Sequence, residues 1–453
     1  MRRFVWLWLA ISSLVGAQCA LSETRPQYGG TLHVSLHAAP GSLDPASATD
    51  SFELRNLTSL LFETMVETDD AGRLRPGLSS SWQSGSNQRR WQFRLRRGIK
   101  FHDGTLLTAE GAAAALRAAN PAWRVLSEAD QVIIELDAPN ATFPAELALR
   151  RHAIVKRNSD GSLAGTGPFH ISDWQPGKKL SLAAEESYWR GRPFVDAIEI
   201  ELGKNTHDQQ LAFELGRAQL IDVPAEQVHR DAMAGYHAIS SQPIELLALV
   251  FTREAQSPEE KALREALALS IERSSIRNVL LQGTGQPTAS ILPNWMNGYG
   301  FVFPTDANLS AARHAREQVR ATPAWTISYD AGDGLSRLIA ERVTLNARDA
   351  ELNLQPTSNS SADVRLARIP LTSDARSALV EVARAADLPM PKIASDSADD
   401  LYTAESAMLS SRRLIPLFHL PVNYACAATV KACQVSSSGA WNLQNVWLGP
   451  PKP

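Results

Sequence analysis

The stretch FHDGTLLTAEGAAAAL, residues 101–116, offers a possible acid–base or metal pair directly before a helix-forming alanine run. Asp103 and Gly104 indicate a turn, because glycine accepts positive φ and the aspartate side chain binds the following backbone. Thr108 has the side chain and the place of a helix N-cap. A metal site at His102 would need partner ligands that the local sequence lacks. The stretch therefore predicts a strand, a turn and a helix start.

Outward from this stretch, short strands with period-two alternation are mixed with amphipathic helices. The alternating apolar residues are Leu32, Val34 and Leu36, then Trp91, Phe93 and Leu95, then Ile198, Ile200 and Leu202. The clearest helix is SPEEKALREALALSIER, residues 257–273, in which Ser257 is the expected N-cap, Pro258 takes the first position and Glu260 completes a capping box. Its buried stripe would comprise Leu263, Leu267 and Ile271. The fold class is therefore α/β.

The N-terminus has the pattern of an export signal. Two arginines precede a short apolar run, residues 4–17, which is too short for a membrane span and ends in small residues. We expect a signal peptide over residues 1–17, cleavage after Ala17 and a periplasmic protein. Cys19 leaves lipid anchoring as an alternative, although Gln18 stands where a lipidation signal prefers glycine or alanine. No later run reaches 18 apolar residues, so we expect the mature chain to be soluble.

Charge and cysteine content exclude several partners. The chain of 453 residues has a formal net charge of −3 and no basic blocks, which argues against nucleic acid. Cys426 and Cys433 lie seven residues apart, and in an oxidising compartment this spacing predicts a local disulfide across a turn. No Cys or His cluster accompanies them, so neither a zinc site nor any other metal or cofactor is expected.

Motifs of catalysis are missing from the sequence. It has no GxSxG, GxxxxGK[ST] or HExxH pattern, and GTGPF (165–169) and GTGQP (283–287) indicate turns rather than phosphate loops. His33 and His37 fall on one face of a strand, too far apart to share an ion without a bulge. We therefore expect no catalytic residue, although an unusual periplasmic hydrolase stays as an alternative.

Several segments together resemble the family 5 extracellular solute-binding proteins, the peptide- and nickel-binding subunits of ABC importers. The resemblance is almost continuous in the first half of the chain and faint between about 300 and 410. The segments that carry it are YGGTLHVSLHAAPGSLDPA (28–46), LLFETMVETDDAGRLRPGLSSSW (60–82), WQFRLRRGIKFHDGTLLTAE (91–110), GTGPFHISDWQPGKKLSLAAEESYWRGRPFVDAIEI (165–200), LREALALSIER (263–273) and RRLIPLFHLPVNYA (412–425).

The resemblance implies a bilobed periplasmic-binding-protein fold with a ligand enclosed between two hinged lobes. A small extra domain would be inserted into the first lobe. The implied boundaries are 26–52, 160–251 and 415–453 for the first lobe, 53–159 for the inserted subdomain and 252–414 for the second lobe. The hinge would fall near residues 246–251 and 414–418.

The resemblance also bears on the ligand. The family's peptide binders hold the ligand's α-amine with an acidic side chain in a tryptophan- and aspartate-rich stretch, but residues 362–383 lack that pattern and offer only Asp374. ELALRRHAIV (146–155) is similar to a segment in which the nickel-chelate branch uses an arginine for ligand carboxylates, and Arg151 takes that place. Guanidinium suits a carboxylate because it offers two parallel donors. The alternative is that Arg150 and Arg151 are surface charges at a helix end.

The sequence thus predicts an exported, monomeric solute-binding protein. It would capture a small solute, either peptide-like or a carboxylate-bearing metal chelate, and deliver it to an ABC transporter permease. A solute-sensing receptor component is the alternative. The residues expected to contact the ligand are Ser42, Leu43, Arg150, Arg151, Arg253, Trp295, Tyr299, Asp374, His419 and Asn423.

Overall fold

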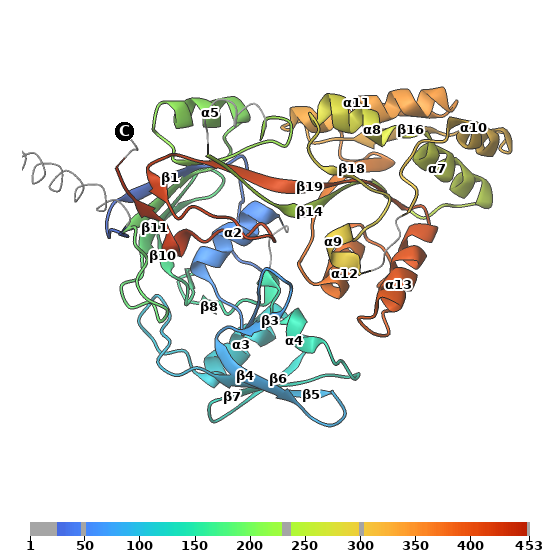
Figure 1. The fold of residues 1–453 in the computed structure, drawn as a ribbon. Coiled ribbons are helices and arrows are strands. Elements are labelled where there is room, and N and C mark those ends of the chain that lie inside the picture. Colours follow the sequence, from blue (N-terminus) through green and yellow to red (C-terminus); the bar gives the residue numbers. More distant parts are fainter. Residues whose placement is uncertain (1–24, 47–50, 229–236, 299–302, 451–453) are drawn as a thin grey trace, which may run out of the picture.

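The structure is a computed structural model that describes residues 25–46, 51–228, 237–298 and 303–450 (Figure 1). The expected signal peptide, with Ala17 and Cys19, and the expected ligand residue Tyr299 lie outside these residues. Two lobes stand side by side, and a smaller subdomain projects from the first lobe (Figure 1). The prediction of a bilobed α/β fold is confirmed.

One sheet runs through both lobes and contains eleven of the strands found in the described residues. Across the sheet the order is β10 (Phe169–Gln175), β11 (Lys179–Ala184), β12 (Ala197–Glu201), β1 (Thr31–Ser35), β13 (Leu220–Asp222), β19 (Leu414–Cys426), β14 (His237–Phe251), β18 (Val364–Pro370), β16 (Ala324–Ser328) and β17 (Asn353–Thr357), with β15 (Gln286–Pro287) paired to β19. The apolar positions predicted from alternation in β1 and β12 are buried, so that prediction is confirmed.

β14 and β19 are the strands that cross from one lobe to the other (Figure 1). Their antiparallel register shifts repeatedly within residues 240–245, where Pro243 stands opposite Pro421. Neither proline has an N–H group to donate to the ladder. Residues 246–251, where a hinge was expected, pair with β18 on one side and β19 on the other, and their register with β19 shifts once more between Leu247 and Ala248. The hinge at these residues stays a prediction.

The core of the first lobe lies between its part of the large sheet and the helix α2 (Phe52–Leu61). Ser51 caps α2, since its Oγ accepts a hydrogen bond from the Leu54 N–H at 3.2 Å. The helix buries Leu57 and other apolar residues against the sheet. The expected boundary at residue 53 assigned α2 to the inserted subdomain, but its packing leads us to propose that this subdomain begins after α2. α5 (Thr206–Glu214) lies on the other side of this part of the sheet (Figure 1).

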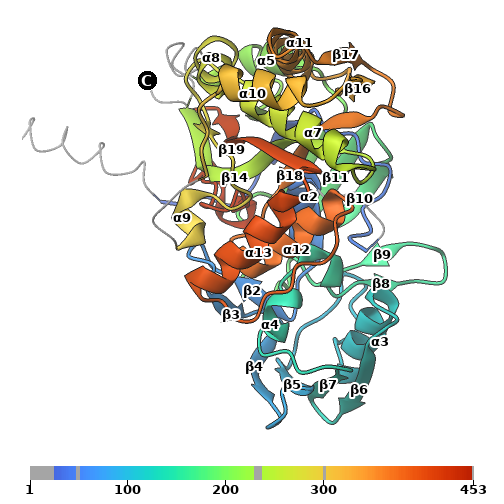
Figure 2. The same ribbon diagram turned by 90° about the vertical axis from the view of Figure 1, so that its right-hand side faces the viewer.

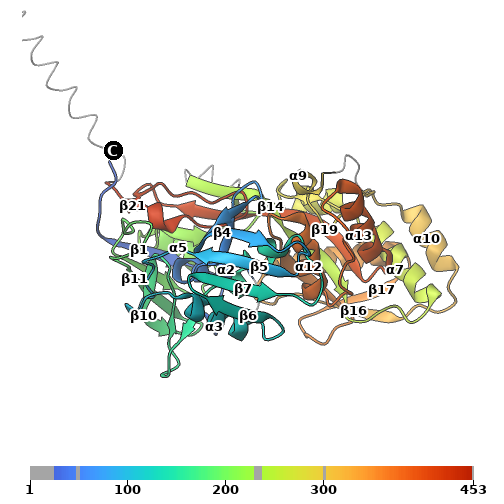
Figure 3. The same ribbon diagram turned by 90° about the horizontal axis from the view of Figure 1, so that it is seen from below.

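The inserted subdomain has its own sheet and core. The sheet order is β4 (Ser79–Ser84), β5 (Arg90–Leu95), β7 (Gln131–Glu135) and β6 (Arg124–Glu128). Accompanying elements are the hairpin β2 (Val66–Thr68) and β3 (Leu74–Pro76), the pair β8 (Lys156–Arg157) and β9 (Leu163–Ala164), and the helices α3 (Ala109–Ala119) and α4 (Phe143–Glu146). Trp91, Phe93 and Leu95 face this core, as their alternation predicted. Seen from below, the subdomain lies in front of the first lobe (Figure 3).

The stretch at residues 101–116 is a turn followed by a helix. Gly104 has a φ of +81°, and Thr108 caps α3 by accepting from the backbone N–H three residues later at 3.1 Å. The strand predicted before the turn is wrong, because only a single bridge between Lys100 and Leu106 forms there. Asp103 accepts a hydrogen bond from the backbone within the turn, and it also pairs with a lysine of β8.

The inserted subdomain joins the first lobe through a buried carboxylate. Glu63 accepts hydrogen bonds from Thr166 Oγ1 at 2.7 Å, from Tyr188 Oη at 2.9 Å and from Trp189 Nε1 at 2.9 Å. Burial raises the pKa of Glu63, while these donors and the nearby Arg190 oppose that rise. Three segments that are far apart in the sequence therefore meet on one side chain.

His102 belongs to the same junction. Its backbone N–H donates to the Gly165 carbonyl at 2.9 Å, its Nδ1 accepts from the Gly165 N–H at 3.2 Å, and its Nε2 lies 3.1 Å from the Gly167 carbonyl. This pattern fits a neutral ring with the proton on Nε2, and burial lowers the pKa of His102 to about 4. Both ring nitrogens are engaged in joining two backbones, so His102 has a structural role.

The second lobe places helices on both faces of its part of the sheet. On one face lie α7 (Pro258–Ser270), α8 (Arg273–Ser275), a π-helical turn (Ile276–Leu280), α10 (Leu309–Glu317) and α11 (Gly334–Asp349), and on the other lie α9 (Asn294–Asn297), α12 (Ala375–Ala385) and α13 (Ala398–Ser410). The predicted stripe of α7 is buried. Ser257 caps this helix at 3.2 Å, but Glu260 accepts from the Gln256 N–H at 2.9 Å, so the capping box is incomplete.

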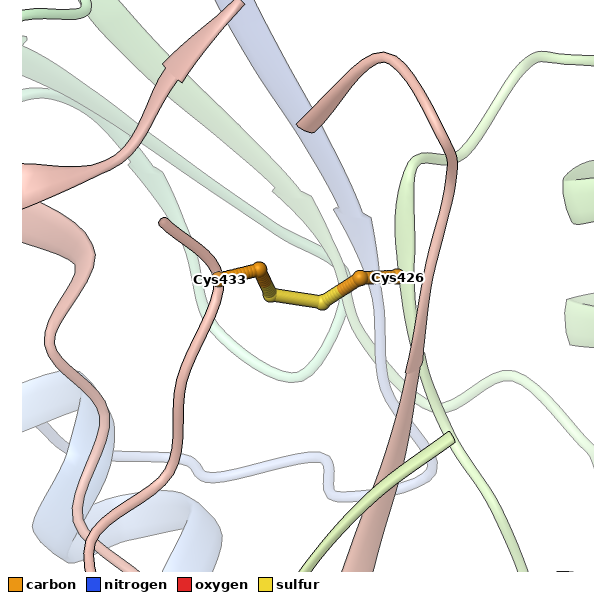
Figure 4. Close-up of a disulfide and its surroundings, with 2 residues drawn as sticks. All are labelled: Cys426 and Cys433. Atoms are coloured by element: carbon orange, nitrogen blue, oxygen red, sulfur yellow. A yellow bond between two sulfur atoms is a disulfide. The ribbon is translucent and has the colours of Figure 1, made fainter. Parts of the chain in front are cut away.

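After β19 the chain returns to the first lobe. It forms β20 (Val430–Lys431), a 3-10 turn (Leu443–Asn445) and β21 (Trp447–Leu448). The predicted disulfide between Cys426 and Cys433 is present, with a Cα–Cα distance of 6.7 Å (Figure 4). Within the described ranges, no helix combines the length and the apolar character needed to cross a bilayer. The same residues contain no group of three or more His, Cys, Asp or Glu arranged to hold a metal ion.

The junction of lobe and subdomain can be tested at a glycine. A Cβ added at Gly165 would lie 1.9 Å from the Leu61 carbonyl oxygen, and both groups are backbone-anchored. We expect Gly165→Ala to lower the free energy of unfolding by about 3 kcal/mol, because neither backbone can yield cheaply. Thermal or urea unfolding measures this change.

Gly334 provides a matched control, since a Cβ there meets nothing within 4 Å at the start of α11. Gly334→Ala should change stability by less than about 1 kcal/mol, and in the stabilising direction. Equal stability of the two variants would contradict the tight junction.

Candidate functional site

A cavity of about 380 Å³ lies between the lobes. One wall comes from α2 and from the inserted subdomain, and the other comes from the end of β18 and from α12. A loop that precedes the C-terminal 3-10 turn closes one side. The lining residues are Pro45, Ala46, Phe52, Leu54, Arg55, Asn56, Thr58, Ser59, Thr64, Glu67, Thr68, Ala148, Leu149, Arg150, Arg151, Leu371, Thr372, Ser373, Glu381, Arg384, Ser438, Gly439 and Ala440.

Arg151 lies in a 3-10 turn, Arg150–His152, at the edge of the inserted subdomain. Its guanidinium binds two carboxylates, Glu146 at 2.7 Å through Nη2 and Glu381 of α12 at 2.7 Å through Nη1. Burial opposes the ionised form of Glu146, but the hydrogen bond from His152 and the charge of Arg151 outweigh it and lower the pKa of Glu146 to about 2. Arg151 therefore binds two carboxylates of the protein itself, and its Nε donates to His152 Nε2 at 3.2 Å.

Arg150 differs from its neighbour. Its Nη1 donates to the Phe62 carbonyl at 3.2 Å, and among the described residues no carboxylate oxygen lies within 4.0 Å of its guanidinium. Burial lowers the pKa of Arg150, and the more distant Glu67 and Glu63 partly offset this effect. Glu67 is itself paired with an arginine after β11, Arg190, at 2.7 Å. Arg150 thus has more unused donor capacity than Arg151.

Arg55 reaches across the cavity from the first turn of α2. Its Nη1 donates to the Leu371 carbonyl at 2.6 Å and its Nη2 to the Pro370 carbonyl at 3.3 Å, both at the end of β18. Ser51 sets its position by capping the helix one turn earlier. Arg55 therefore links the first lobe to the second along the cavity.

The electrostatic character of the cavity is basic. Its lining contains four arginines, which are Arg55, Arg150, Arg151 and Arg384, and two glutamates, which are Glu67 and Glu381. This leaves an excess of two positive charges in a partly buried space, where charge interactions are stronger than in water. Phe52 is the only aromatic residue among the described lining residues, so the cavity lacks tryptophan walls.

The structure brings two of the ten expected ligand residues, Arg150 and Arg151, to the cavity. Leu43 packs into the first-lobe core, and Ser42 is exposed and accepts from the backbone of its own loop. Arg253 is exposed and pairs with Glu260 at 2.9 Å. These three residues are not among those that line the cavity, although Pro45 and Ala46 of the same loop as Ser42 are.

The remaining expected residues have structural partners. Trp295 donates its Nε1 to the Pro243 carbonyl at 2.9 Å in a separate surface hollow. His419 is buried, with Nε2 2.9 Å from the Ile291 carbonyl, and burial lowers its pKa to about 4. Asn423 is buried in β19, and its Nδ2 lies 3.2 Å from the carbonyl of the proline two residues earlier.

Asp374 is the N-cap of α12, where its Oδ2 accepts from the Ser377 N–H at 2.8 Å. This matches the helix-capping interpretation of that residue rather than the amine-holding one.

Sequence reasoning missed Arg55, Glu381 and Arg384. The last two lie three positions apart on α12, a spacing typical of a solvent-exposed ion pair, and they are 3.2 Å apart in the structure. Nothing in the local sequence distinguishes them from the many other charged residues on helices. They line the cavity only because the second lobe lies against the inserted subdomain in the folded protein.

The family model of the bacterial extracellular solute-binding proteins, family 5 Middle, matches residues 73–369. Over 326 residues the chain is 23% identical to the probable D,D-dipeptide-binding periplasmic protein DdpA of Escherichia coli (strain K12), covering 65% of this chain and 61% of that protein. It is 27% identical over 262 residues to the nickel-binding periplasmic protein of Escherichia coli (strain K12), covering 50% of this chain and 49% of that protein. These matches thus span about half to three fifths of the relatives' length.

Among solved structures, the fold is similar to the periplasmic binding protein DppA from Helicobacter pylori in complex with the peptide STSA. The TM-score is 0.81 at 17% sequence identity, and the superposition covers 94% of this chain and 99% of that chain. At this identity the likeness shows a shared fold.

The loop at Ile291 and Leu292, whose Ile291 carbonyl contacts His419, gives a prediction about how stability depends on pH. Glu405 of α13 is fully buried and binds the backbone N–H groups of Ile291 and Leu292. Burial raises the pKa of Glu405 from 4.5 to about 7, although both N–H groups oppose the rise. The stability that this raised pKa contributes is present below pH 4.5 and is lost as pH rises through about 7.

As the pH rises from 5 to 8, the free energy of unfolding should therefore fall less for Glu405→Gln than for the wild type. The two decreases should differ by an amount approaching about 3 kcal/mol. Urea unfolding of both proteins across this range measures it. Parallel pH profiles for the wild type and the variant would contradict the raised pKa.

Proposed function

Because the chain belongs to family 5 of the bacterial extracellular solute-binding proteins, we propose that it captures a small solute between its lobes and delivers it to an ABC transporter. The cavity volume of about 380 Å³ is near the lower end of ligand pockets, which suits a small molecule. Two lobes linked by β14 and β19 can enclose such a molecule by a hinge motion. The protein would act as an exported monomer with an inner-membrane permease as its partner.

The ligand that the cavity favours is an anion. The observation that carries this proposal is the excess of arginines over glutamates in the lining. Carboxylates suit guanidinium groups because two parallel donors meet two acceptor oxygens. A ligand recognised only by a free amine would find two glutamates there, Glu67 and Glu381, and each is already paired with an arginine.

Arg150 is the residue that we propose as the anchor for a ligand carboxylate. Arg151, the anchor expected from the sequence, is occupied by Glu146 and Glu381, whereas Arg150 has one backbone acceptor. A carboxylate bound at Arg150 would also offset the burial that disfavours its charge.

The ligands of the relatives indicate which classes of carboxylate-bearing solute this cavity could bind. One is a probable D,D-dipeptide-binding protein, another binds nickel, and the DppA structure holds a tetrapeptide. We propose that the solute is a carboxylate-bearing short peptide or metal chelate. The small number of aromatic lining residues favours a polar ligand over one with large apolar side chains.

The proposed export has a direct test. Intact mass of the protein recovered from its native host should correspond to a chain that begins at Gln18. A full-length mass would contradict cleavage, and a mass increased by lipid at Cys19 would favour anchoring instead. Alkylation without reduction should leave Cys426 and Cys433 unmodified, because they form a disulfide.

The ligand itself can be released and identified. Freshly purified protein is denatured, and mass spectrometry of the released small molecules should find a carboxylate-bearing solute in near-equimolar amount. Calorimetry with that solute should then show that Arg150→Ala weakens binding by a factor of about 30 or more, since a desolvated charge pair loses one partner at a cost of about 2–5 kcal/mol.

Two control variants separate binding from stability. Arg253→Ala removes an exposed arginine outside the cavity and should leave the affinity unchanged. Asp374→Ala removes the cap of α12, so we expect it to cost about 1 kcal/mol of stability with little effect on affinity. Wild-type affinity in Arg150→Ala, or a large loss on Asp374→Ala, would contradict the carboxylate proposal and favour an amine-recognising peptide binder.

A further inference from the structure

The two sides of the cavity are bound to each other by the protein's own side chains. The hydrogen bonds and ion pairs that join them include several to one segment of the second lobe, residues 370–384, which comprises the end of β18 and most of α12. Figure 2 shows α12 and α13 of the second lobe above the β2–β3 hairpin and α4 of the inserted subdomain. These contacts therefore lie at the wall of the cavity that the second lobe contributes.

The strongest contact is the ion pair of Arg151 and Glu381. The two residues are 230 positions apart in sequence, and Nη1 of the arginine lies 2.7 Å from Oε2 of the glutamate. The side chains are 25% and 11% exposed, so water screens this pair less than a surface pair. Glu146 holds the same guanidinium in place from within the inserted subdomain.

Further contacts support this pair. Arg384 of α12 lies 3.9 Å from Glu146, so a second pair of opposite charges crosses the gap. At the tip of the β2–β3 hairpin, a Cβ added to Gly72 would lie 2.6 Å from the Ser373 carbonyl oxygen, which shows how closely the two backbones approach. Arg55 adds its hydrogen bonds to the Leu371 and Pro370 carbonyls.

We propose that Arg151 and Glu381 form a latch that keeps the lobes closed when no solute is bound. The inference rests on the proposed function in taking this cavity as the solute site. A ligand shifts the open–closed balance only by its differential affinity for the two states. With the latch in place, closure needs less binding energy from the solute, and a ligand carboxylate is directed to Arg150 because Glu381 already occupies Arg151.

The test measures the distance between the inserted subdomain and the second lobe without any solute. Spin labels are placed at two exposed positions, Asn87→Cys at the tip of the β4–β5 loop and Ala407→Cys on α13, in a Cys19→Ser background. The protein is unfolded with its disulfide intact, freed of small molecules and refolded. Pulsed electron resonance then gives the distance distribution.

The wild type should show mainly the short, closed distance. Glu381→Gln and Arg151→Gln should each raise the open-to-closed ratio about five- to tenfold, the effect of losing one partly buried ion pair. The double variant should shift no further than the single variants, because both remove the same contact. Salt at about 1 M should shift the wild type in the same direction through screening.

Glu341→Gln is the matched control, since it removes an ion pair with Arg337 at 2.8 Å that stays within α11. Its distance distribution should equal that of the wild type. An unchanged distribution in Glu381→Gln would overturn the latch, as would a wild type that is mainly open and insensitive to salt. If denatured protein released no solute, the proposed solute-binding function would be contradicted, but these distances would not change. The failure of the proposed function can therefore be distinguished from the failure of the latch.

Discussion

The carboxylate of Glu63 is the contact on which the arrangement of the first lobe and the inserted subdomain depends. It accepts hydrogen bonds from Thr166, Tyr188 and Trp189, which reach it from two distant segments. A buried acid is tolerated only when donors satisfy it, and removing it would leave buried donors without an acceptor. His102 completes the junction through the backbone of Gly165. Sequence segments that look like separate motifs are therefore parts of one buried network.

The position of that junction determines which side chains line the cavity. Glu63 follows α2 directly, so fixing it orients the helix that carries Arg55 and the neighbouring 3-10 turn that carries Arg150 and Arg151. The second lobe contributes the charged face of α12 to the opposite wall. Rigid elements thus place guanidinium groups on both sides of a small cavity, which is the arrangement expected for binding an anion by closure.

The candidate site was only partly predictable. Arg150 and Arg151 were expected from a local motif and lie at the cavity. His419 and Trp295 were expected there and instead bind backbone carbonyls elsewhere. An aromatic or histidine near a crossing strand has no feature in the sequence that tells a cleft position from a packed one. Glu381 was missed because its partner is 230 positions away.

The sequence by itself determined the local features, because their energies depend on residues a few positions apart. The turn at Gly104, the caps at Thr108 and Ser257, the alternating strands and the disulfide follow from such short-range rules. Only the tertiary structure decided which charges meet. Arg151 is paired and Arg150 keeps donor capacity because the second lobe brings α12, and not another helix, to the inserted subdomain. The two partners of such a contact are far apart in the sequence, so short-range rules cannot predict it. The packing of whole lobes determines which residues come together.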